Sequence, residues 1–458
     1  MDDEYERKRR LSFLYLFLIY SALFICRGIL PANLNPMMVS LGTNRPSIAW
    51  LMAIDLLVLI VSILFFGYFG EKLSEKYSIK KFFIIFQIGW VICFGLIVFS
   101  QNFLQFSILH VLSAVFRGSY LPIAYAMIGD FYPPKERGAK FGTISVGLIL
   151  GAGGGLLFGT LLGNIPDIGW RIAYGLGFIL SLLAVEGYTR NGIIPRRGKY
   201  EPELQDLEKE VKYDYKITLS SLKKLFKTKS VGILLIAVLI TGVTTTTLGI
   251  WSLDYFTFSQ LTIIADIDFR RLIAMMIFLI AGFGAIPGNI WGGKWGDKYY
   301  KAGKLRGRVI FSIVGIIVGF TCFFGFYLIP LFGATTWEII LSATLILSLG
   351  FLGFLFTSLS VGNQFAIYSE VCVPEARASA NSLHGVMVSI GGIVGNLLLV
   401  FSITGFLILP FHVTILVTFG IIGGLLWIIP LFTYPREEKE CRDLMAKRRV
   451  EMEQKFSE

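Results

Sequence analysis

In the N-terminal half, three charged residues lie well inside apolar stretches long enough to cross a bilayer, and they are the first candidates for chemistry. Arg27, near the end of its stretch, and Asp55, near the beginning of the next one, both fall toward the external side of the membrane and could pair. Arg117 lies near the middle of its stretch, with no obvious acid at its own depth. Its planar guanidinium suits a bidentate contact with a negative group of a small molecule. The alternative is that Arg117 bonds backbone carbonyls or shares Asp55.

The C-terminal half offers fewer polar groups in comparable stretches, among them Asp254 near the end of one. A histidine titrates near neutral pH, so His384 could sense a proton. The alternative is a hydrogen-bonded contact between helices, the commoner role of a single histidine among apolar residues. The candidates for substrate binding are Arg117, Arg27, Asp55, Asn363, Gln364 and His384.

Two short segments repeat each other 226 residues apart, each where an apolar stretch gives way to a cationic one. Both read Gly-x-aromatic-Gly-acid-Lys. The residues are Gly67, Gly70, Glu71 and Lys72 in the first copy, and Gly293, Gly296, Asp297 and Lys298 in the second. A second repeat has an ungapped offset of 240 residues: Asp130, Pro134, Arg137, Val146, Gly151 and Gly155 match Glu370, Pro374, Arg377, Val386, Gly391 and Gly395. Such spacing predicts two related halves, which in a membrane protein is typical of a transporter that rocks one half against the other.

The composition indicates a membrane protein. Hydrophobic residues make up 55% of the chain and charged residues 16%, with a mean hydropathy of +0.69, whereas soluble domains carry about 25% charged residues. Twelve apolar runs are long enough to span a core of ~30 Å as helices, and too long for barrel strands. They cover 11–32, 48–70, 82–100, 103–129, 139–163, 171–188, 231–255, 271–293, 307–331, 337–367, 379–404 and 409–432. We expect no cleaved signal peptide, because the first run can itself span and lacks a small-residue cleavage site.

The distribution of cations predicts the orientation. With the N-terminus in the cytoplasm, 36 of the 42 Lys and Arg fall on the cytoplasmic side. Only Arg45, Arg171, Arg270 and Arg271 fall outside. This split follows the positive-inside rule and supports twelve spans. The net charge of +11 therefore reflects topology, and we expect no nucleic-acid partner.

One long polar stretch separates the two halves. We divide the chain into an N-terminal bundle at 1–188, a cytoplasmic linker at 189–230, a C-terminal bundle at 231–433 and a charged cytoplasmic tail at 434–458. The linker passes through the acidic sequence EPELQDLEKE and ends in KITLSSLKKLFKTK. That last part is either an interfacial helix on the membrane surface or a solvated linker with a helical end.

Other kinds of site have no support in the sequence. The five cysteines and three histidines are scattered, with no metal-ligand spacing and no external cysteine pair. The GAGGG segment at 151–155 lacks the Lys and Ser/Thr of a phosphate loop, and it falls inside an apolar run, where small residues favour close helix packing. We expect no metal, no cofactor and no enzymatic activity.

The repeated loop motif resembles that of the major facilitator superfamily, which reads G-x-L-a-D-R-x-G-R-K after the second span with a degenerate copy after the eighth. Here the copies read GYFGEKLSEK and GKWGDKYYKA, with Glu71 in place of the Asp, or Glu75 in another register. The resemblance implies cytoplasmic salt bridges that form in one conformation and break in the other. The residues expected to gate in this way are Gly67, Gly70, Glu71, Lys72, Glu75, Asp130, Arg137, Gly293, Asp297, Lys298, Glu370 and Arg377. The alternative is that Glu71 and Lys72 only mark a solvated loop.

Within this superfamily, the segment IGDFYPPKERGAKFG, together with Pro122, looks like the spinster-type lipid transporters and some organic-anion transporters. The first span, FICRGILP, keeps Arg27 but has Cys26 where the spinster-type pattern has Asp. The spinster-type pattern also has an Arg in its fourth span. In this chain His110 or apolar residues occupy that region, and the arginine, Arg117, follows about two helical turns later.

The resemblance implies an all-α membrane protein with twelve transmembrane helices in two pseudo-symmetric six-helix bundles. Spans one and four would line a central cavity, where we expect Arg117 to hold the negative group of the substrate while Arg27 and Asp55 tune the local charge. The first functional hypothesis is a secondary active transporter of a small organic anion or amphiphile, working by alternating access. The alternatives are a proton-coupled drug or lysolipid exporter and a non-transporting receptor or scaffold. We expect a monomer in the plasma membrane, surrounded by lipid, with possible proton or ion coupling.

Overall fold

The computed structural model describes residues 2–76, 78–163, 165, 168–195, 197–204, 215, 225, 227–403 and 409–457, and within them the chain is helical without strands. The first half contains α1 (Asp2–Ala32), α2 (Leu34–Leu41), α3 (Arg45–Lys76), α4 (Ile79–Ile97), α5 (Phe103–Arg117), α6 (Tyr120–Phe131), α7 (Pro134–Gly163) and α8 (Gly169–Asn191). The second contains α10 (Lys229–Tyr255), η2 (Phe256–Gln260), α11 (Ile267–Gly282), α12 (Ala285–Lys301), α13 (Leu305–Leu328), α14 (Thr336–Ser358), α15 (Val361–Val371), η3 (Pro374–Ala376), α16 (Arg377–Ile403), α17 (Leu409–Leu426) and α18 (Pro430–Ser457). A short helix in the linker, η1, covers Pro202–Leu204.

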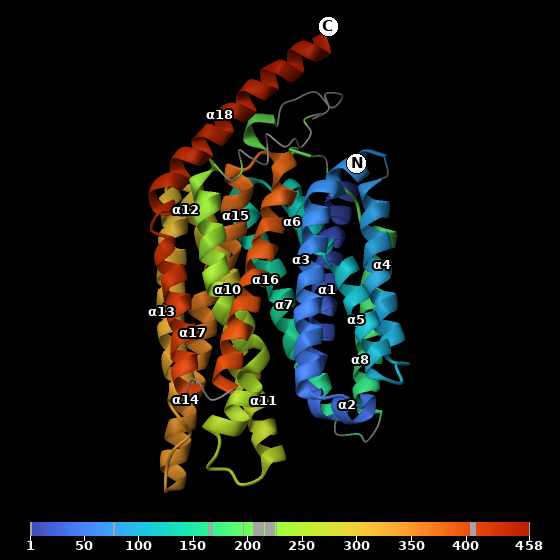
Figure 1. Cartoon of the computed structure of the whole chain (residues 1–458). Helices are drawn as coiled ribbons and strands as arrows, with labels where there is room; N and C mark the ends of the chain where they lie inside the picture. Colours follow the sequence, from blue (N-terminus) through green and yellow to red (C-terminus); the bar gives the residue numbers. More distant parts are fainter. Residues whose placement is uncertain are drawn as a thin grey trace.

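The helices form two bundles that lie side by side, with both termini at the same end of the molecule (Figure 1). We call this the termini end. By length and composition, ten segments of the described chain can cross a membrane, and the pair α17–α18, bent by 48°, makes an eleventh. The helix α16 occupies the predicted eleventh span of the twelve. Large apolar side chains such as Leu57, Leu183 and Leu341 are exposed, as lipid-facing residues are in a bundle of this kind.

Of the spans interrupted in the described structure, the fourth and the tenth are interrupted at equivalent places in the two halves. The fourth consists of α5 and α6, which meet at Gly118 and Ser119, and the tenth of α14 and α15, which meet at Leu359 and Ser360. The breaks lie 241 residues apart, close to the offset of the sequence repeat. Discontinuous helices at matching positions are typical of transporter folds made of repeats.

The sequence-based boundaries need some correction. The helix α2 was not predicted, and the last helix does not end near 433: α18 begins at Pro430 and continues through the predicted tail to Ser457. A regular run of Glu, Lys, Arg and Met, all good helix formers, accounts for this extension. Most of the predicted interfacial helix at 216–229 lies outside the described residues.

The bundles meet through four helix pairs in a pseudo-symmetric way: α7 packs against α12 and α15, and α16 packs against α3 and α6. The first glycine of each motif copy lies at such a contact. A Cβ at Gly67 would collide with the Ser382 side chain on α16, and one at Gly293 would collide with the Gly138 carbonyl on α7. Glycine is therefore required for the close approach of the two backbones at these points.

Candidate functional site

A buried ion pair lies within the N-terminal bundle. Arg117, the last residue of α5, places Nη2 2.5 Å from Oδ1 of Asp55 on α3, and the two side chains are 2% and 4% exposed. Nδ1 of His110 lies 3.0 Å from the same carboxylate oxygen. His110 and Arg117 are seven residues apart, which is two helical turns, so both face α3. The expectation that Arg117 lacks an acid at its own depth is wrong.

Arg27 is the cation without a described carboxylate partner. It lies on α1, is only partly buried, and has its guanidinium carbon 5.5 Å from the centre of the Phe24 ring. The expected pair with Asp55 is absent from the described contacts, because Asp55 already bonds Arg117. Tyr20, Phe24 and Arg27 follow one another at helical spacing, so they share one side of α1. Tyr20 on that side contacts Tyr120 and Tyr125 of α6, with ring centres 5.0 and 6.1 Å apart.

Aromatic rings from both bundles meet between this region and the termini end. Phe365 on α15 has its ring centre 4.4 Å from Tyr125 on α6 and 5.8 Å from Phe141 on α7. On the other side, the His384 ring lies 4.5 Å from Phe365. Nδ1 of His384 is buried and has no hydrogen-bond partner in the part of the chain that the structure describes. His384 therefore borders the contact between the bundles as an unsatisfied polar group.

The two amides predicted on the tenth span have different surroundings. Asn363 is fully buried and donates to the carbonyls of Gly292 and Leu359 at 3.1 and 3.0 Å, so it fastens the start of α15 to α12. Gln364 donates to the Tyr368 hydroxyl at 2.9 Å. The side chain of Asp254 is outside the described part of the structure.

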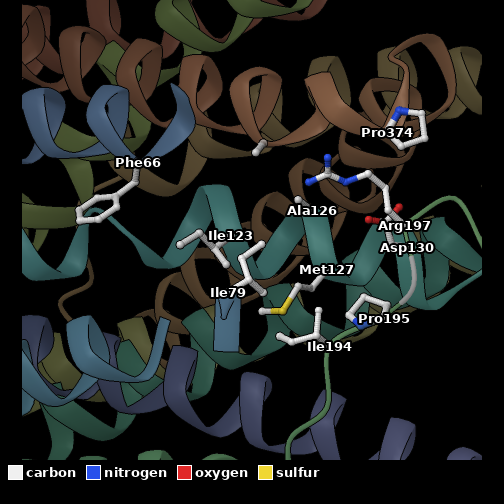
Figure 2. Close-up of a pocket in the computed structure, with 11 residues that line it drawn as sticks. Phe66, Ile79, Ile123, Ala126, Met127, Asp130, Ile194, Pro195, Arg197 and Pro374 are labelled. Carbon is white, nitrogen blue, oxygen red and sulfur yellow. The ribbon is translucent and has the colours of Figure 1, made fainter. Parts of the chain in front are cut away.

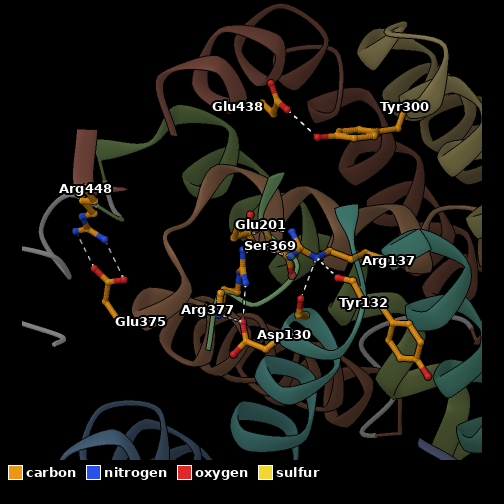
Figure 3. A network of polar contacts seen from close by, with 12 residues as sticks. Asp130, Tyr132, Arg137, Glu201, Tyr300, Ser369, Glu375, Arg377, Glu438 and Arg448 are labelled. Atoms are coloured by element: carbon orange, nitrogen blue, oxygen red, sulfur yellow. Dashed lines mark hydrogen bonds and ion pairs between the residues drawn. The ribbon is translucent and has the colours of Figure 1, made fainter. Parts of the chain in front are cut away.

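At the termini end, charged side chains connect the bundles (Figure 3). Arg377 on α16 donates to Asp130 on α6 at 2.9 Å. Arg137 on α7 reaches the Ser369 carbonyl on α15 at 3.5 Å. Asp297 on α12 accepts from the backbone N–H groups of Gly138 and Ala139 on α7 at 2.9 and 2.7 Å. The predicted residues Asp130, Arg137, Asp297 and Arg377 are thus brought together as contacts between the halves.

Glu370 departs from the symmetry of the repeat. Its counterpart Asp130 pairs across the interface, but Glu370 stays within its own bundle, 3.3 Å from Arg308. Tyr434 of α18 donates a hydrogen bond to it. Arg308 also contacts Asp297 at 3.1 Å, so one arginine joins both acids.

The remaining predicted gating residues form no described contact between the bundles. Lys298 is exposed at the end of α12 and forms none of the described ion pairs. Gly70, Glu71, Lys72 and Glu75 belong to α3, but the side chains of 68–76 lie outside the described part of the structure.

Sequence reasoning missed Glu201. This linker residue is buried at the termini end and contacts Nη2 of both Arg137 and Arg377 at 2.5 Å. Burial alone would raise the pKa of its carboxyl, but the two guanidinium charges lower that pKa to about 2. An acidic linker sequence gave no signal that one of its carboxylates would be buried.

A cavity of about 260 Å³ lies beside this cluster, between the N-terminal bundle, the linker and α16 (Figure 2). Most of its lining is apolar, including Ile123 and Met127 of α6, while Asp130 and Arg197 lie at one end. Because Pro374 and Ala378 come from the second half, the cavity has this shape only while the bundles are together at the termini end.

Two pseudo-symmetric helical bundles, in contact through polar groups at the termini end and built from helices long and apolar enough to cross a membrane, define a multi-pass membrane protein. A family model described as the Major Facilitator Superfamily matches residues 16–396, and the chain belongs to this superfamily.

Curated relatives match over part of their length. The chain is 29% identical to "Uncharacterized MFS-type transporter YwfA" of Bacillus subtilis (strain 168), over 34% of this chain and 38% of that protein. It is 28% identical to "Multidrug resistance protein 3" of the same organism, over 33% and 29%. It is 26% identical to the "Cis,cis-muconate transport protein" of Acinetobacter baylyi, over 26% and 28%. The matches thus span less than two fifths of these relatives.

Among solved structures, the fold is similar to a bacterial homologue of the human lysosomal transporter Spinster in an inward-facing, unoccupied conformation. The TM-score is 0.60, with 15% identity over 94% of this chain and 98% of the other. At this identity the likeness concerns the fold alone, and it agrees with the twelve-span architecture.

Proposed function

We propose that the protein is a secondary transporter that moves a small organic anion or an amphiphile across the membrane by alternating access. The superfamily and the two-bundle fold support this proposal. So do the contacts between the bundles at the termini end, since they are side-chain contacts that can form and break. The names of the relatives point to multidrug, cis,cis-muconate, hexuronate and riboflavin transport.

The observation that carries the substrate class is Arg27, a partly buried residue whose guanidinium has no carboxylate partner among the described contacts. A cation inside a membrane span is costly unless an anion or water compensates it. Arg117 has a carboxylate of its own, whereas Arg27 has a described contact only with an aromatic ring. A planar guanidinium beside Phe24 and Tyr20 suits a carboxylate or phosphate attached to an apolar or aromatic body. In this proposal Arg27 holds the substrate, and Arg117 has the structural role of joining α5 to α3.

We also propose the orientation and the captured state. The excess of Lys and Arg near the termini end supports a cytoplasmic location for it in a plasma membrane. Among the described residues, the hydrogen bonds that join the bundles all lie at that end. The molecule is then closed toward the cytoplasm, which corresponds to an outward-facing or occluded step, and we expect it to work as a monomer.

A binding experiment on purified protein tests the substrate class. The panel contains cis,cis-muconate, a hexuronate, riboflavin and a lysophospholipid, measured by calorimetry against wild type, Arg27→Ala, Arg27→Lys and Arg190→Ala. Arg190 is an exposed arginine paired with Glu186 and serves as the matched control. We expect at least one anion to bind, with a tenfold or larger loss in Arg27→Ala and a smaller loss in Arg27→Lys. Equal affinity in wild type and Arg27→Ala would refute the role of Arg27. Binding without uptake into proteoliposomes would favour a receptor.

A second candidate function is proton-coupled export of a drug or lysolipid, favoured by the unpartnered ring nitrogen of His384 at the contact between the bundles. A histidine there could gain a proton in one state and lose it in the other. Uptake driven by a pH gradient in proteoliposomes would support this candidate if His384→Gln abolishes the gradient dependence. Gradient-independent transport by wild type would exclude it.

A further inference from the structure

The linker between the two bundles crosses the termini end as a short segment that both halves hold. We call residues 199–204 the strap. At its beginning, Arg9 of α1 donates to the Tyr200 hydroxyl at 2.9 Å. The ammonium of Lys199 lies 3.7 Å from the centre of the Tyr5 ring, also on α1. These contacts fix the first residues of the strap to the N-terminal bundle.

The end of the strap is held by α18, which continues from the C-terminal bundle. Arg442 donates to the carboxylate of Glu203 at 2.7 Å, and Arg449 reaches the Glu203 carbonyl at 3.4 Å. Leu204 packs with Met445 and Met452 in a small apolar cluster. The strap is therefore attached at one end to α1 and at the other to α18.

Glu201 lies between these attachments and points into the interface. Its Oε1 contacts Nη2 of Arg137 on α7 and Nη2 of Arg377 on α16, each at 2.5 Å. The Glu201 residue is 7% exposed, and the two arginines are almost completely buried. One linker carboxylate thus bridges two like charges that belong to opposite bundles (Figure 3).

The two arginines depend on Glu201 to different degrees. Arg377 keeps a second carboxylate, that of Asp130. Arg137 otherwise bonds only backbone carbonyls, those of Gly129, Tyr132 and Ser369, among the described contacts. Removing the Glu201 charge would leave a buried guanidinium uncompensated beside a second one, which opposes the closed arrangement.

We propose that Glu201 is a latch, a gating carboxylate supplied by the linker that holds the termini ends of the bundles together, and that α18 keeps it in place through the strap. When the bundles separate at this end, Arg137 and Arg377 move apart and Glu201 can follow only one of them. The latch therefore favours the closed termini end by binding both arginines only in that state. The proposal rests on contacts at the termini end and does not depend on which substrate is carried.

The test measures the separation of the bundles without substrate. Nitroxide labels at Lys135→Cys on α7 and Lys301→Cys on α12, both exposed positions, report the distance across the termini end by double electron–electron resonance. The less buried native cysteines are first replaced, as Cys322→Ser and Cys441→Ser. The variant is Glu201→Gln, and the matched control is Glu186→Gln, an exposed acid on α8 that pairs with Arg190.

We expect one short distance between the labels in wild type and in Glu186→Gln. In Glu201→Gln we expect a second, longer distance, with the ratio of open to closed molecules raised at least tenfold. A folded Glu201→Gln protein with the wild-type distances would overturn the latch. If Glu201→Gln does not fold, the double variant Arg9→Ala and Arg442→Ala loosens both ends of the strap and keeps the buried charges. A raised open population in that variant supports the proposal, and wild-type distances contradict it.

Discussion

Arg137 and Arg377 are equivalent residues of the two halves, 240 positions apart, and they form the same backbone contact. Arg137 donates through Nε to the carbonyl of Gly129 at 3.0 Å, and Arg377 donates through Nε to the carbonyl of Ser369 at 3.1 Å. In both cases the acceptor lies eight residues earlier, at the end of a broken span. Each arginine thereby keeps its outer nitrogens free to reach the opposite half.

The first prediction concerns the buried pair of Asp55 and Arg117. Asp55→Asn leaves the Arg117 charge uncompensated in a buried place, so we expect it to lower the free energy of unfolding by about 3–5 kcal/mol. Arg27→Ala removes a charge without a described partner and should change the stability little. Unfolding followed by intrinsic fluorescence in detergent compares the two variants. Equal stability of Asp55→Asn and wild type would show that the pair is not structural.

The second prediction concerns the acids of the repeated motif. Asp297→Asn weakens its bonds to the Gly138 and Ala139 N–H groups and to Arg308, so the closed termini end should become less populated and transport slower. By the same motif, we expect Glu71→Gln to act similarly. Transport rates in proteoliposomes measure the effect. Substrate affinity in a variant locked in one state should hardly change. Wild-type rates in both variants would refute the gating assignment.

The third prediction uses the close approach of α7 and α12. A Cβ at Gly293 collides with backbone atoms of Gly138 and Ala139, which cannot move aside as a side chain can. Gly293→Ala should therefore open the termini end, seen as a longer distance between the labels at 135 and 301. Gly249→Ala on α10 is the matched control, since a Cβ there meets no atom within 4 Å. A closed Gly293→Ala protein would show that this contact is not tight.

The fourth prediction concerns topology. A cysteine at Arg270 should react with an impermeant thiol reagent in intact cells, and a cysteine at Lys209 should react only after the cells are opened. The reason is the concentration of cations at the termini end, which the positive-inside rule places in the cytoplasm. Labelling of Lys209 from outside would invert the proposed orientation.

The fifth prediction concerns pH. Glu201 has a pKa lowered from the ordinary 4.5 to about 2 in the closed structure, because two guanidinium groups face it. A lowered pKa stabilises the closed arrangement fully above about pH 4.5, and that contribution is lost as the pH falls toward 2. The label distance should therefore stay constant from pH 8 to 5. Opening between pH 8 and 6 would point to another titrating group, and His384→Gln would identify it if the opening disappears.

The sequence predicts much of the fold because hydrophobic length, charge asymmetry and internal repeats are all properties of short segments. It also indicates the residues that join the bundles, since Asp130, Arg137, Asp297 and Arg377 stand at repeated positions near helix ends. The seven-residue spacing of His110 and Arg117 indicates that both side chains lie on one face of the helix and could bind the same carboxylate. The acid that they face depends on the rotation of α5 about its axis relative to α3. The lengths of the apolar runs in the sequence do not determine that rotation.

The burial of Glu201 could not be predicted from the sequence for a different reason. It occurs in a hydrophilic segment without periodicity, where a solvated side chain is the reasonable expectation. Its burial depends on Tyr200 and Glu203 being held by helices almost 200 residues earlier and more than 230 residues later. Such contacts between distant parts of the chain have no local signature.

The breaks in the fourth and tenth spans have a mechanical consequence. The helices α5 and α6, and likewise α14 and α15, are joined by a two-residue interruption that keeps helical backbone angles, so each span consists of two helical rods joined at a point where it can bend, which serves as a pivot. The rods nearer the termini end carry Asp130 and Glu370, whereas Arg117 belongs to the rod beyond the pivot of the fourth span. The termini-end rods can therefore swing as the bundles part while the Asp55–Arg117 anchor stays in place.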